Sequence, residues 1–336
     1  MNPLSTLIPN QGLHFCVILD FLLADKKGRR ENIPIEMIAV LLYNHNEKRQ
    51  GGETVKKKAI MIATAASALL IAAGVVHSNI VPELNKSSVV CERLPSQFDG
   101  FVIAQVSDLH NTELGKNNGR IIGLLEESAP DIIVITGDLI DSRRTDIGKA
   151  LAFVNQAVKI APCYYVTGNH ESRIEAYPEL KKGLEEAGVT VLDGRFAEIE
   201  KNGATVTLAG IDDPNFKAKS EPQKYAEIAD STLEDMNLSE KEFVVLLAHR
   251  PELFDVYAKH NVDLVFSGHA HGGQFRLPFI GGLYVPNQGL FPEYDSGVYA
   301  SGDTQMMVSR GLGNSIMPIR INNRPEVVAV ELKVSQ

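Results

Sequence analysis

The alternation of short apolar segments with longer amphipathic ones over residues 98–266 constrains the fold more than any other feature. The apolar segments have the length and β-branched content of buried strands, and they lie at residues 101–106, 131–136, 163–166, 243–247 and 262–266. The segments typical of helices lie at residues 118–128, 145–159, 178–187, 222–236 and 252–260. This rhythm predicts βαβ units, in which helices cover the faces of largely parallel sheets.

Two other stretches predict additional strands. Residues 190–211 change to strands separated by turns, and the chain after residue 275 is mostly β in character up to a last strand at 326–333. A domain of residues 98–336 is long enough for one large core. We therefore expect an α/β fold, a four-layer α/β/β/α sandwich of two mixed β-sheets flanked by helices.

An uncharged apolar run at residues 59–76 predicts an N-terminal transmembrane helix. It has about the minimum length for a bilayer span and directly follows Lys56, Lys57 and Lys58. The positive-inside rule then places residues 1–58 in the cytoplasm and the C-terminal domain on the extracytoplasmic side of the cell membrane. The alternative is an Ala-rich helix buried in the globular domain.

The segments around this helix carry weaker signals. We expect the helix to be kept as a single-pass anchor, because no clean Ala-x-Ala processing site stands at its end. Residues 77–97 contain several Asn, Ser and Pro residues, which predicts a linker. For residues 1–50 two explanations stay open, a disordered segment or a start codon assigned too early.

Charge and cysteine content argue against two kinds of site. Residues 1–58 contain nine Lys and Arg against six Asp and Glu, so the remaining 24 basic and 36 acidic residues leave a net charge of −12 for the rest. An acidic domain is a poor partner for a nucleic-acid backbone. Cys16, Cys91 and Cys163 are scattered without a Cys-x-x-Cys pair, so neither a disulfide framework nor a thiolate metal site is expected.

Polar residues follow five of the predicted strands at the point where each strand ends. In open α/β sheets the functional site lies beyond the carboxyl ends of the strands, so these residues are expected to meet at one rim. They are, in chain order, Asp108 and His110, Asp138, Asn169 and His170, His249, and finally His269 and His271. The other histidines, His14, His45, His77 and His260, are interpreted as surface or locally satisfied residues.

This mixture of donors suits a pair of divalent cations. Each residue by itself has a structural alternative, since Asp forms turns and caps helices and Asn occupies left-handed turns. Together, carboxylate, imidazole and amide-oxygen donors are what Mn²⁺, Fe²⁺ or Zn²⁺ accept. A carboxylate that bridges two such ions holds them as a clamp, which generates hydroxide from water and neutralises a phosphoryl group.

The set Asp-x-His, Gly-Asp, Gly-Asn-His, His and Gly-His-x-His closely resembles the signature of the calcineurin-like metallophosphoesterase superfamily, over about residues 100–275. The resemblance implies that one metal is held by Asp108, His110 and His271, and the other by Asn169, His249 and His269. Asp138 would bridge the two metals. His170 would be the catalytic histidine that hydrogen-bonds the phosphate or protonates the leaving oxygen. Many members of the superfamily carry Asp at the position of Glu171, which we expect to orient a ligand.

A narrower resemblance extends the match toward the C-terminus. Residues 267–278 (SGHAHGGQFRLP), 309–313 (SRGLG) and 318–320 (PIR) are similar to those of the membrane-anchored YaeI-like and YkuE-like phosphodiesterases. That group agrees with the predicted anchor. Related enzymes with a similar domain hydrolyse UDP-2,3-diacylglucosamine, so a lipid-linked substrate would suit a tethered domain.

The resulting hypothesis is a metal-dependent phosphodiesterase, in which a hydroxide bridging two divalent metal ions attacks a phosphoester in line. Arg276 is the preferred candidate for binding a second charged group of the substrate, ahead of Arg143, Arg250 and Arg310. Substrate preference would be set by the loops at 212–224 and 283–303. Neither a nucleic acid nor an obligate protein partner is expected.

Three alternatives stay open at this point. One is a pyrophosphatase that acts on a lipid-linked or nucleotide-sugar substrate such as UDP-2,3-diacylglucosamine. The others are a non-catalytic membrane-tethered scaffold and a lipid-binding protein with structural metals. Loss of metal ligands would mark a scaffold, and none is missing from the motifs. Seven candidate ligands shared by two ions leave positions for water or substrate, which favours catalysis.

Overall fold

The computed structural model describes residues 52–314 and 317–335. The chain forms two compact units, one up to Val76 and the other from His77 onward. The described part of the first unit belongs to helix α3 (Gly52–Ile80), whose last residues enter the second unit. Most of the predicted cytoplasmic segment, up to position 51, lies outside the described residues.

Helix α3 is long and apolar enough to cross a membrane over Lys56–Ile80, with a mean hydropathy of 2.3. Its apolar side chains are exposed, among them Ile60, Met61 and Leu69. Helices that are apolar all round are found buried in protein or in lipid. The helix is not buried among the described residues, so it is a candidate membrane span. The predicted run at 59–76 lies inside the observed helix, which continues to Ile80.

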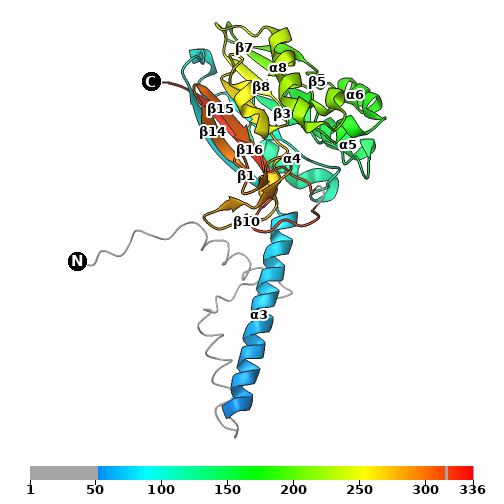
Figure 1. Ribbon diagram of the computed structural model, residues 1–336, viewed down its shortest axis with the longest axis vertical. Coiled ribbons are helices and arrows are strands. Elements are labelled where there is room, and N and C mark those ends of the chain that lie inside the picture. Colours follow the sequence, from blue (N-terminus) through cyan, green and yellow to red (C-terminus); the bar gives the residue numbers. More distant parts are fainter. Residues whose placement is uncertain (1–51, 315–316, 336) are drawn as a thin grey trace, which may run out of the picture. The chain divides into compact units, whose positions relative to one another are not determined.

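Two six-stranded sheets form the second unit (Figure 1). The first has the order β1 (Glu83–Cys91), β16 (Glu326–Val334), β2 (Val102–Val106), β3 (Ile132–Thr136), β4 (Cys163–Val166) and β5 (Thr190–Val191). The second has the order β14 (Gly297–Ser301), β15 (Thr304–Val308), β9 (Leu264–Ser267), β8 (Val244–Leu247), β7 (Ala204–Gly210) and β6 (Arg195–Lys201). Both contain parallel and antiparallel pairs, so each sheet is mixed, as predicted.

Two short hairpins follow the strand β9. The first pairs β10 (Arg276–Leu277) with β11 (Gly281–Gly282), and the second pairs β12 (Tyr284–Val285) with β13 (Gly289–Leu290). The mostly β character predicted for this region is therefore correct, although these strands lie outside the two large sheets.

The central strands are mostly apolar because each is buried on both faces. In β3, Ile132 and Val134 belong to one core cluster, whereas Ile133 and Ile135 belong to another. Successive side chains of a strand point to opposite faces, so one strand contributes to two cores. The cluster around Val134 also contains Val245 and Phe266 of the second sheet, so the two sheets pack against each other there.

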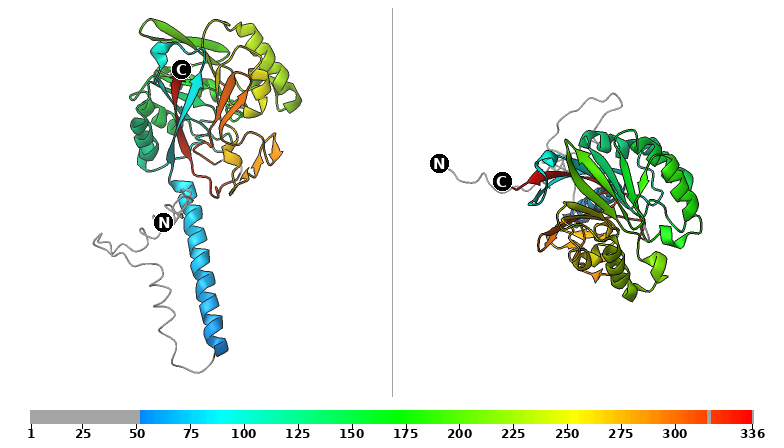
Figure 2. Two further views of the ribbon diagram at one scale, coloured as in Figure 1. Left: turned by 90° about the vertical axis from the view of Figure 1, so that its left-hand side faces the viewer. Right: turned by 90° about the horizontal axis from the view of Figure 1, so that it is seen from above.

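Helices pack on the other face of each sheet. Against the first sheet lie α4 (Gly119–Ser128), α5 (Ile147–Ala157) and α6 (Tyr177–Glu186), and against the second lie α8 (Tyr225–Met236) and the short α9 (Phe254–Tyr257). Figure 2 shows α5 and α6 on one outer side of the strands and α8 on the opposite side. A further short helix, α7 (Asn215–Ala218), precedes α8. The predicted helices agree with these positions to within a few residues.

Residues 77–97 differ from the prediction of a linker. All nine residues of β1 pair with β16 in parallel, from Glu83 opposite Glu326 to Cys91 opposite Val334. The polar sequence of β1, with Asn85 and two serines, has low β propensity. Its partner strand comes from the other end of the domain and supplies backbone hydrogen bonds that local sequence does not reveal.

Candidate metal centre

The seven predicted metal ligands come together at the carboxyl ends of strands from both sheets. Asp108, Asp138 and Asn169 follow β2, β3 and β4 of the first sheet, whereas His249 and His269 follow β8 and β9 of the second. Parallel neighbours end at one edge of a sheet, which is why loops far apart in sequence converge here. Each of these seven residues is at most 6% exposed.

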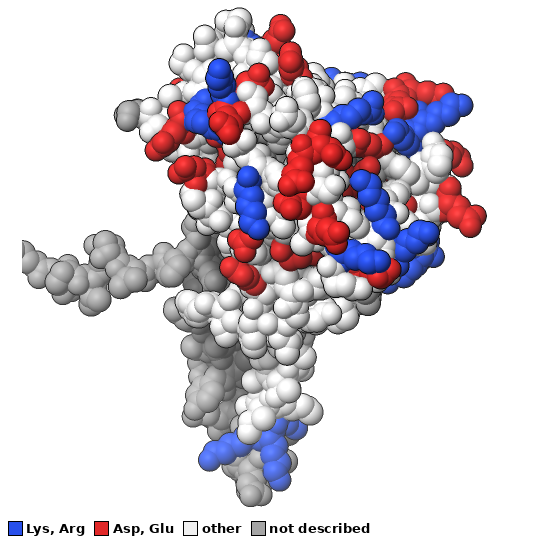
Figure 3. All heavy atoms as spheres, turned by 45° about the horizontal axis from the view of Figure 1, so that its top comes forward, with Lys and Arg blue, Asp and Glu red and all other residues white. Residues whose placement is uncertain are grey.

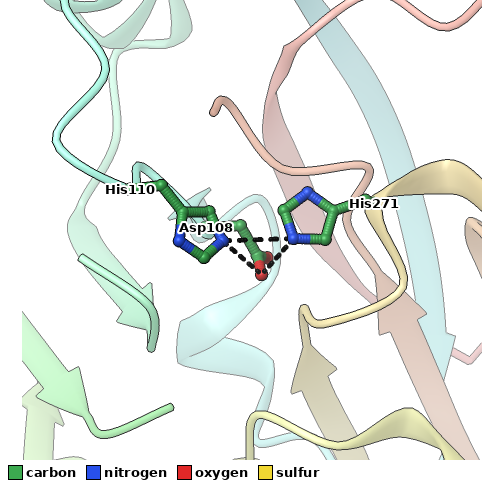
Figure 4. A group of neighbouring side chains, drawn as sticks. All are labelled: Asp108, His110 and His271. Carbon is green, nitrogen blue, oxygen red and sulfur yellow. Dashed lines mark hydrogen bonds and ion pairs between the residues drawn. The ribbon is translucent and has the colours of Figure 1, made fainter. Parts of the chain in front are cut away.

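Asp108, His110 and His271 form the first group (Figure 4). The Nε2 atoms of the two imidazoles lie 3.1 Å apart, and His271 Nε2 lies 3.3 Å from Asp108 Oδ1. Two ring nitrogens and a carboxylate oxygen thus face a common point. This geometry could hold one cation.

Asp138, His249 and His269 form the second group. His249 Nε2 lies 3.4 Å from Asp138 Oδ2, and the same carboxylate oxygen lies 3.5 Å from His110 Nε2 of the first group. Asp138 therefore faces imidazoles of both groups. A carboxylate in that position could be shared by two cations.

Three buried atoms of this site lack a hydrogen-bond partner among the described residues, namely His110 Nδ1 and the two candidate metal donors Asn169 Oδ1 and His249 Nε2. His249 Nδ1 lies 2.7 Å from the carbonyl oxygen of Thr136, so Nδ1 donates there and Nε2, once deprotonated, presents its lone pair. A buried acceptor without a donor costs about 1–3 kcal/mol. Divalent cations would satisfy both lone pairs, so the residues fit a metal centre.

Five of the seven ligands have a positive φ angle, which is uncommon for residues other than glycine. They are Asp108 (52°), His110 (48°), Asp138 (50°), His269 (65°) and His271 (48°). Such strained backbone is characteristic of functional sites. Neighbouring glycines allow it, since a Cβ atom on Gly268 would overlap the Ser107 hydroxyl and the Asp108 carboxylate.

Burial keeps most of the imidazoles neutral. It lowers the pKa of His110 to about 3, and it also holds the pKa values of His269 and His271 well below the usual range. For His249 burial acts in the same direction, but the Asp138 carboxylate outweighs it and raises the pKa to about 10. Neutral imidazole is the form that binds metals.

His170 lies beside this centre, with Nε2 4.0 Å from Asp138 Oδ2. Its Nδ1 accepts a hydrogen bond of 3.0 Å from the backbone N–H of Ser142. Neutral imidazole carries one proton, so the proton is on Nε2, the nitrogen directed at the metal centre. Burial lowers the pKa of His170, which keeps this tautomer neutral near pH 7.

Glu171 is fully buried and joins the loops that carry the ligands. Its carboxylate accepts backbone N–H bonds from Asp138 (2.9 Å), Ile140 (3.2 Å) and Gly168 (2.7 Å). Burial and the nearby Asp138 charge raise the pKa of Glu171 to about 7. These contacts agree with the orienting role expected for Glu171.

The arginines considered for substrate binding are all engaged with carboxylates. Arg276 pairs with Asp295 at 3.0 Å and donates to the Gly272 carbonyl. The others pair as Arg143 with Asp141, Arg250 with Asp213 and Glu252, and Arg310 with Glu83 and Glu326. Substrate binding by Arg276 stays a prediction.

Two other cations line a cavity of about 560 Å³ beside His110, namely Arg144 and Lys149. Sequence reasoning missed both, although they follow the Gly-Asp motif at six and eleven residues after Asp138.

Sequence reasoning also missed two residues that contact the histidines. Asn287 Nδ2 lies 3.3 Å from His269 Nε2, and the buried Arg320 lies 3.4 Å from His271 Nδ1 through Nη2. Nothing local in the sequence connects either pair.

Comparison with known proteins agrees with this site. The family model of the calcineurin-like phosphoesterases matches residues 101–273. The uncharacterized metallophosphoesterase YkuE of Bacillus subtilis is 30% identical over 292 residues, which cover 82% of this chain and 96% of that protein. A transmembrane protein with a metallophosphoesterase domain from Danio rerio is 28% identical and covers 81% and 62%. The phosphodiesterase YaeI of Escherichia coli is 28% identical and covers 69% and 82%.

Proposed function

The chain belongs to the calcineurin-like phosphoesterase family and is a metallophosphoesterase, and from this premise we propose that it is a phosphodiesterase with a dinuclear metal centre. The observation that carries the proposal is the position of Asp138, whose one carboxylate oxygen faces both His110 and His249 within 3.5 Å. The name of the relative YaeI supports a diester substrate.

We propose that one cation is held by Asp108, His110, Asp138 and His271, and the other by Asp138, Asn169, His249 and His269. Bound there, two divalent cations such as Mn²⁺, Fe²⁺ or Zn²⁺ would supply Lewis-acid chemistry that neutralises phosphoryl charge and lowers the pKa of water. The lone pairs of Asn169 Oδ1 and His249 Nε2 support this assignment.

His170 is proposed to act on the substrate through Nε2. In the neutral form its N–H donates a hydrogen bond to a phosphoryl oxygen, and the Ser142 N–H fixes this tautomer. To protonate the leaving oxygen, His170 would first take up a second proton at Nδ1 in place of the Ser142 hydrogen bond, and Asp141 Oδ1, 3.5 Å from Nδ1, would stabilise that imidazolium.

The proposal extends to the surroundings of the site. The three core clusters support a four-layer α/β/β/α order for the unit from His77 onward. Helix α3 and the transmembrane relative support a single-pass membrane protein, and the three lysines before the span support an extracytoplasmic catalytic domain. A scaffold function is disfavoured because the ligand set is intact.

The test is the substitution Asp138→Ala, with Asp235→Ala on the exposed side of α8 as the control. Hydrolysis of bis(p-nitrophenyl) phosphate in the presence of Mn²⁺ should fall by about 10³-fold or more, with loss of bound metal measured by mass spectrometry. The control should keep both. Full activity of the Asp138 variant would overturn the metal assignment, and a higher rate on the aryl monoester would overturn the diesterase.

The sidedness has its own test. A cysteine introduced by Glu234→Cys should react in intact cells with a membrane-impermeant maleimide. Cys91 and Cys163 are buried, and Cys16 is replaced by Ser in the same chain so that the label reports on residue 234. Labelling that requires lysed cells would place the domain in the cytoplasm.

A further inference from the structure

Residues 277–292 contain no charged side chain and expose most of their large apolar ones. The exposed residues are Leu277 (41%), Phe279 (106%), Ile280 (61%), Tyr284 (52%), Leu290 (66%) and Phe291 (62%). They belong to the two hairpins β10–β11 and β12–β13 and to the turns beside them. Single exposed apolar residues are ordinary, but such a concentration marks an interaction surface.

A second loop extends this surface. Met317, Ile319 and Ile321 are each between 42% and 44% exposed. The two loops are held together by hydrogen bonds, since Gln274 Nε2 donates to the Met317 and Ile319 carbonyls and the Arg276 N–H donates to the Ile321 carbonyl. We call these nine exposed residues of the two loops the apolar rim.

The charged side chains of the domain lie elsewhere on the face that Figure 3 shows. Lys, Arg, Asp and Glu cover its upper part, whereas the lower edge of the domain is white. The rest of the domain is acidic, so the apolar rim contrasts with its surroundings in both charge and polarity.

The end of the membrane span is joined to the same loops. Asn79, in the last turn of α3 and already part of the second unit, exchanges two hydrogen bonds of 2.9 Å with the backbone of Arg320. The next residues are held too, because Arg324 donates to the Val81 and Pro82 carbonyls. Ile80, the final residue of the span, is 46% exposed. Within the second unit, residues 79–82 therefore lie directly beside Arg320 and Arg324, next to Ile319 and Ile321 in the sequence.

The apolar rim also adjoins the metal centre. The β12–β13 turn carries Asn287, which lies 3.3 Å from His269, and the second loop contains Arg320, which lies 3.4 Å from His271. The cavity beside His110 is lined by Arg144 and Lys149 and also by Pro318 of the second loop. A phosphate in this cavity would thus meet cations and the loop that carries Met317 and Ile319.

We propose that the apolar rim inserts into the interface of the membrane spanned by α3, and that the substrate is a phosphoester of a lipid in that membrane. The choice of a lipid surface over a protein partner follows from the chain itself, which emerges from its span at the rim. Large aromatic and aliphatic side chains without charge are suited to the boundary of headgroups and acyl chains. The substrate half of the proposal rests on the phosphodiesterase function proposed above.

Insertion is tested with fluorescence, because the chain contains no Trp. Phe279→Trp supplies a single fluorophore in the full chain, reconstituted into phosphatidylcholine and phosphatidylglycerol vesicles that contain doxyl-labelled lipid. Phe196→Trp, on β6 and 51% exposed, is the matched control. Quenching should be strong at position 279 and weak at 196. Equal quenching at both positions would overturn the docking surface, whatever the enzyme hydrolyses.

The substrate class is tested with Phe279→Asp and Leu290→Asp combined, in the same reconstituted chain. Hydrolysis of phosphatidylglycerol in the vesicles should fall by about tenfold or more, because two apolar side chains no longer enter the interface. Hydrolysis of soluble bis(p-nitrophenyl) phosphate should stay unchanged, as it should for Phe196→Asp with either substrate.

The outcomes separate the two proposals. If the unmodified chain hydrolyses neither compound, the phosphodiesterase function fails while the quenching result still stands. If it hydrolyses only the soluble diester, the lipid substrate is overturned. If the double variant instead converts a dimer to a monomer in detergent and Phe279→Trp is not quenched, the rim binds a second copy of the chain and the membrane proposal is wrong.

Discussion

Residues 269–276 connect the metal centre to the apolar rim. The two regions depart from the usual arrangement of side chains in opposite ways, because the metal centre buries polar groups and the rim exposes apolar ones. In the metal centre, Asp108, Asp138 and the imidazoles are almost completely buried, whereas in the rim Phe279 is fully exposed. Buried lone pairs without donors and exposed clusters of aromatic side chains are both unfavourable in a chain considered alone. The difference teaches that each region is completed by something outside the chain, divalent cations in one and, as we propose, lipid in the other.

The two regions also differ in how they are supported. The ligands are oriented by a dense network of hydrogen bonds, such as those that Glu171 accepts from three backbone N–H groups. The exposed side chains of the rim project from loops that are held at their base, through bonds such as those of Gln274, Arg276 and Asn287. Substitutions should therefore have large effects on function or stability in the first region and small effects on stability in the second.

After Asp138→Ala, the largest effect is expected for His170→Gln. Without the Nε2 proton directed at the metal centre, kcat for bis(p-nitrophenyl) phosphate should fall by about 10²–10³-fold. Metal content should stay unchanged, because His170 is not among the proposed ligands. Ser142→Ala is the control, since the Ser142 backbone N–H still fixes the tautomer, and its rate should stay close to that of the unmodified enzyme. An unchanged kcat for His170→Gln would remove this residue from the chemistry.

Glu171→Ala should reduce the free energy of unfolding by about 3 kcal/mol, because three buried N–H groups would lose their acceptor. Urea denaturation of the detergent-solubilised, metal-free protein measures this. Glu186→Ala, an exposed residue of α6 that pairs with Lys182, should change the stability by less than about 0.5 kcal/mol. Equal effects of the two substitutions would contradict the supporting role of Glu171.

Asp212→Asn should alter the pH dependence of stability. Burial and the neighbouring Asp193 raise the pKa of Asp212 from 3.8 to about 7, so the folded state binds the proton more tightly than the unfolded state. The contribution of Asp212 to stability is thus present below about pH 4 and is lost as the pH rises through about 7. Relative to the unmodified protein, the free energy of unfolding of the variant should rise by roughly 4 kcal/mol over this interval. Parallel stability profiles for the two proteins would refute the raised pKa.

The smallest effect is expected for Phe279→Ser in the apolar rim. A side chain that packs against nothing in the domain contributes little to folding, so the free energy of unfolding in detergent should change by less than about 0.5 kcal/mol. A loss of about 2 kcal/mol or more would mean that Phe279 packs within the domain, and the contrast between the two regions would disappear.

Much of the second unit could be predicted because its signals are local. The strand at 132–136 is a continuous apolar run, and the polar residues that end it, such as Asp138, follow within two positions. Strand β1 was predicted as a linker because its stability comes from β16, more than two hundred residues later, and not from its own composition. The pairing of Arg276 with Asp295 could not be predicted either, because the two residues meet only through the fold, and the substrate role of Arg276 stays a prediction.

The sequence by itself determined the order of the strands and helices, the apolar run before the domain and the side chains that end each central strand. These depend on periodicity and on neighbours a few residues apart. Only the tertiary structure decided that Asp138 faces both imidazole groups, that Arg320 reaches His271, and that the exposed residues of two loops adjoin the end of the span. Such contacts join distant segments, and their geometry is set by how two sheets pack together.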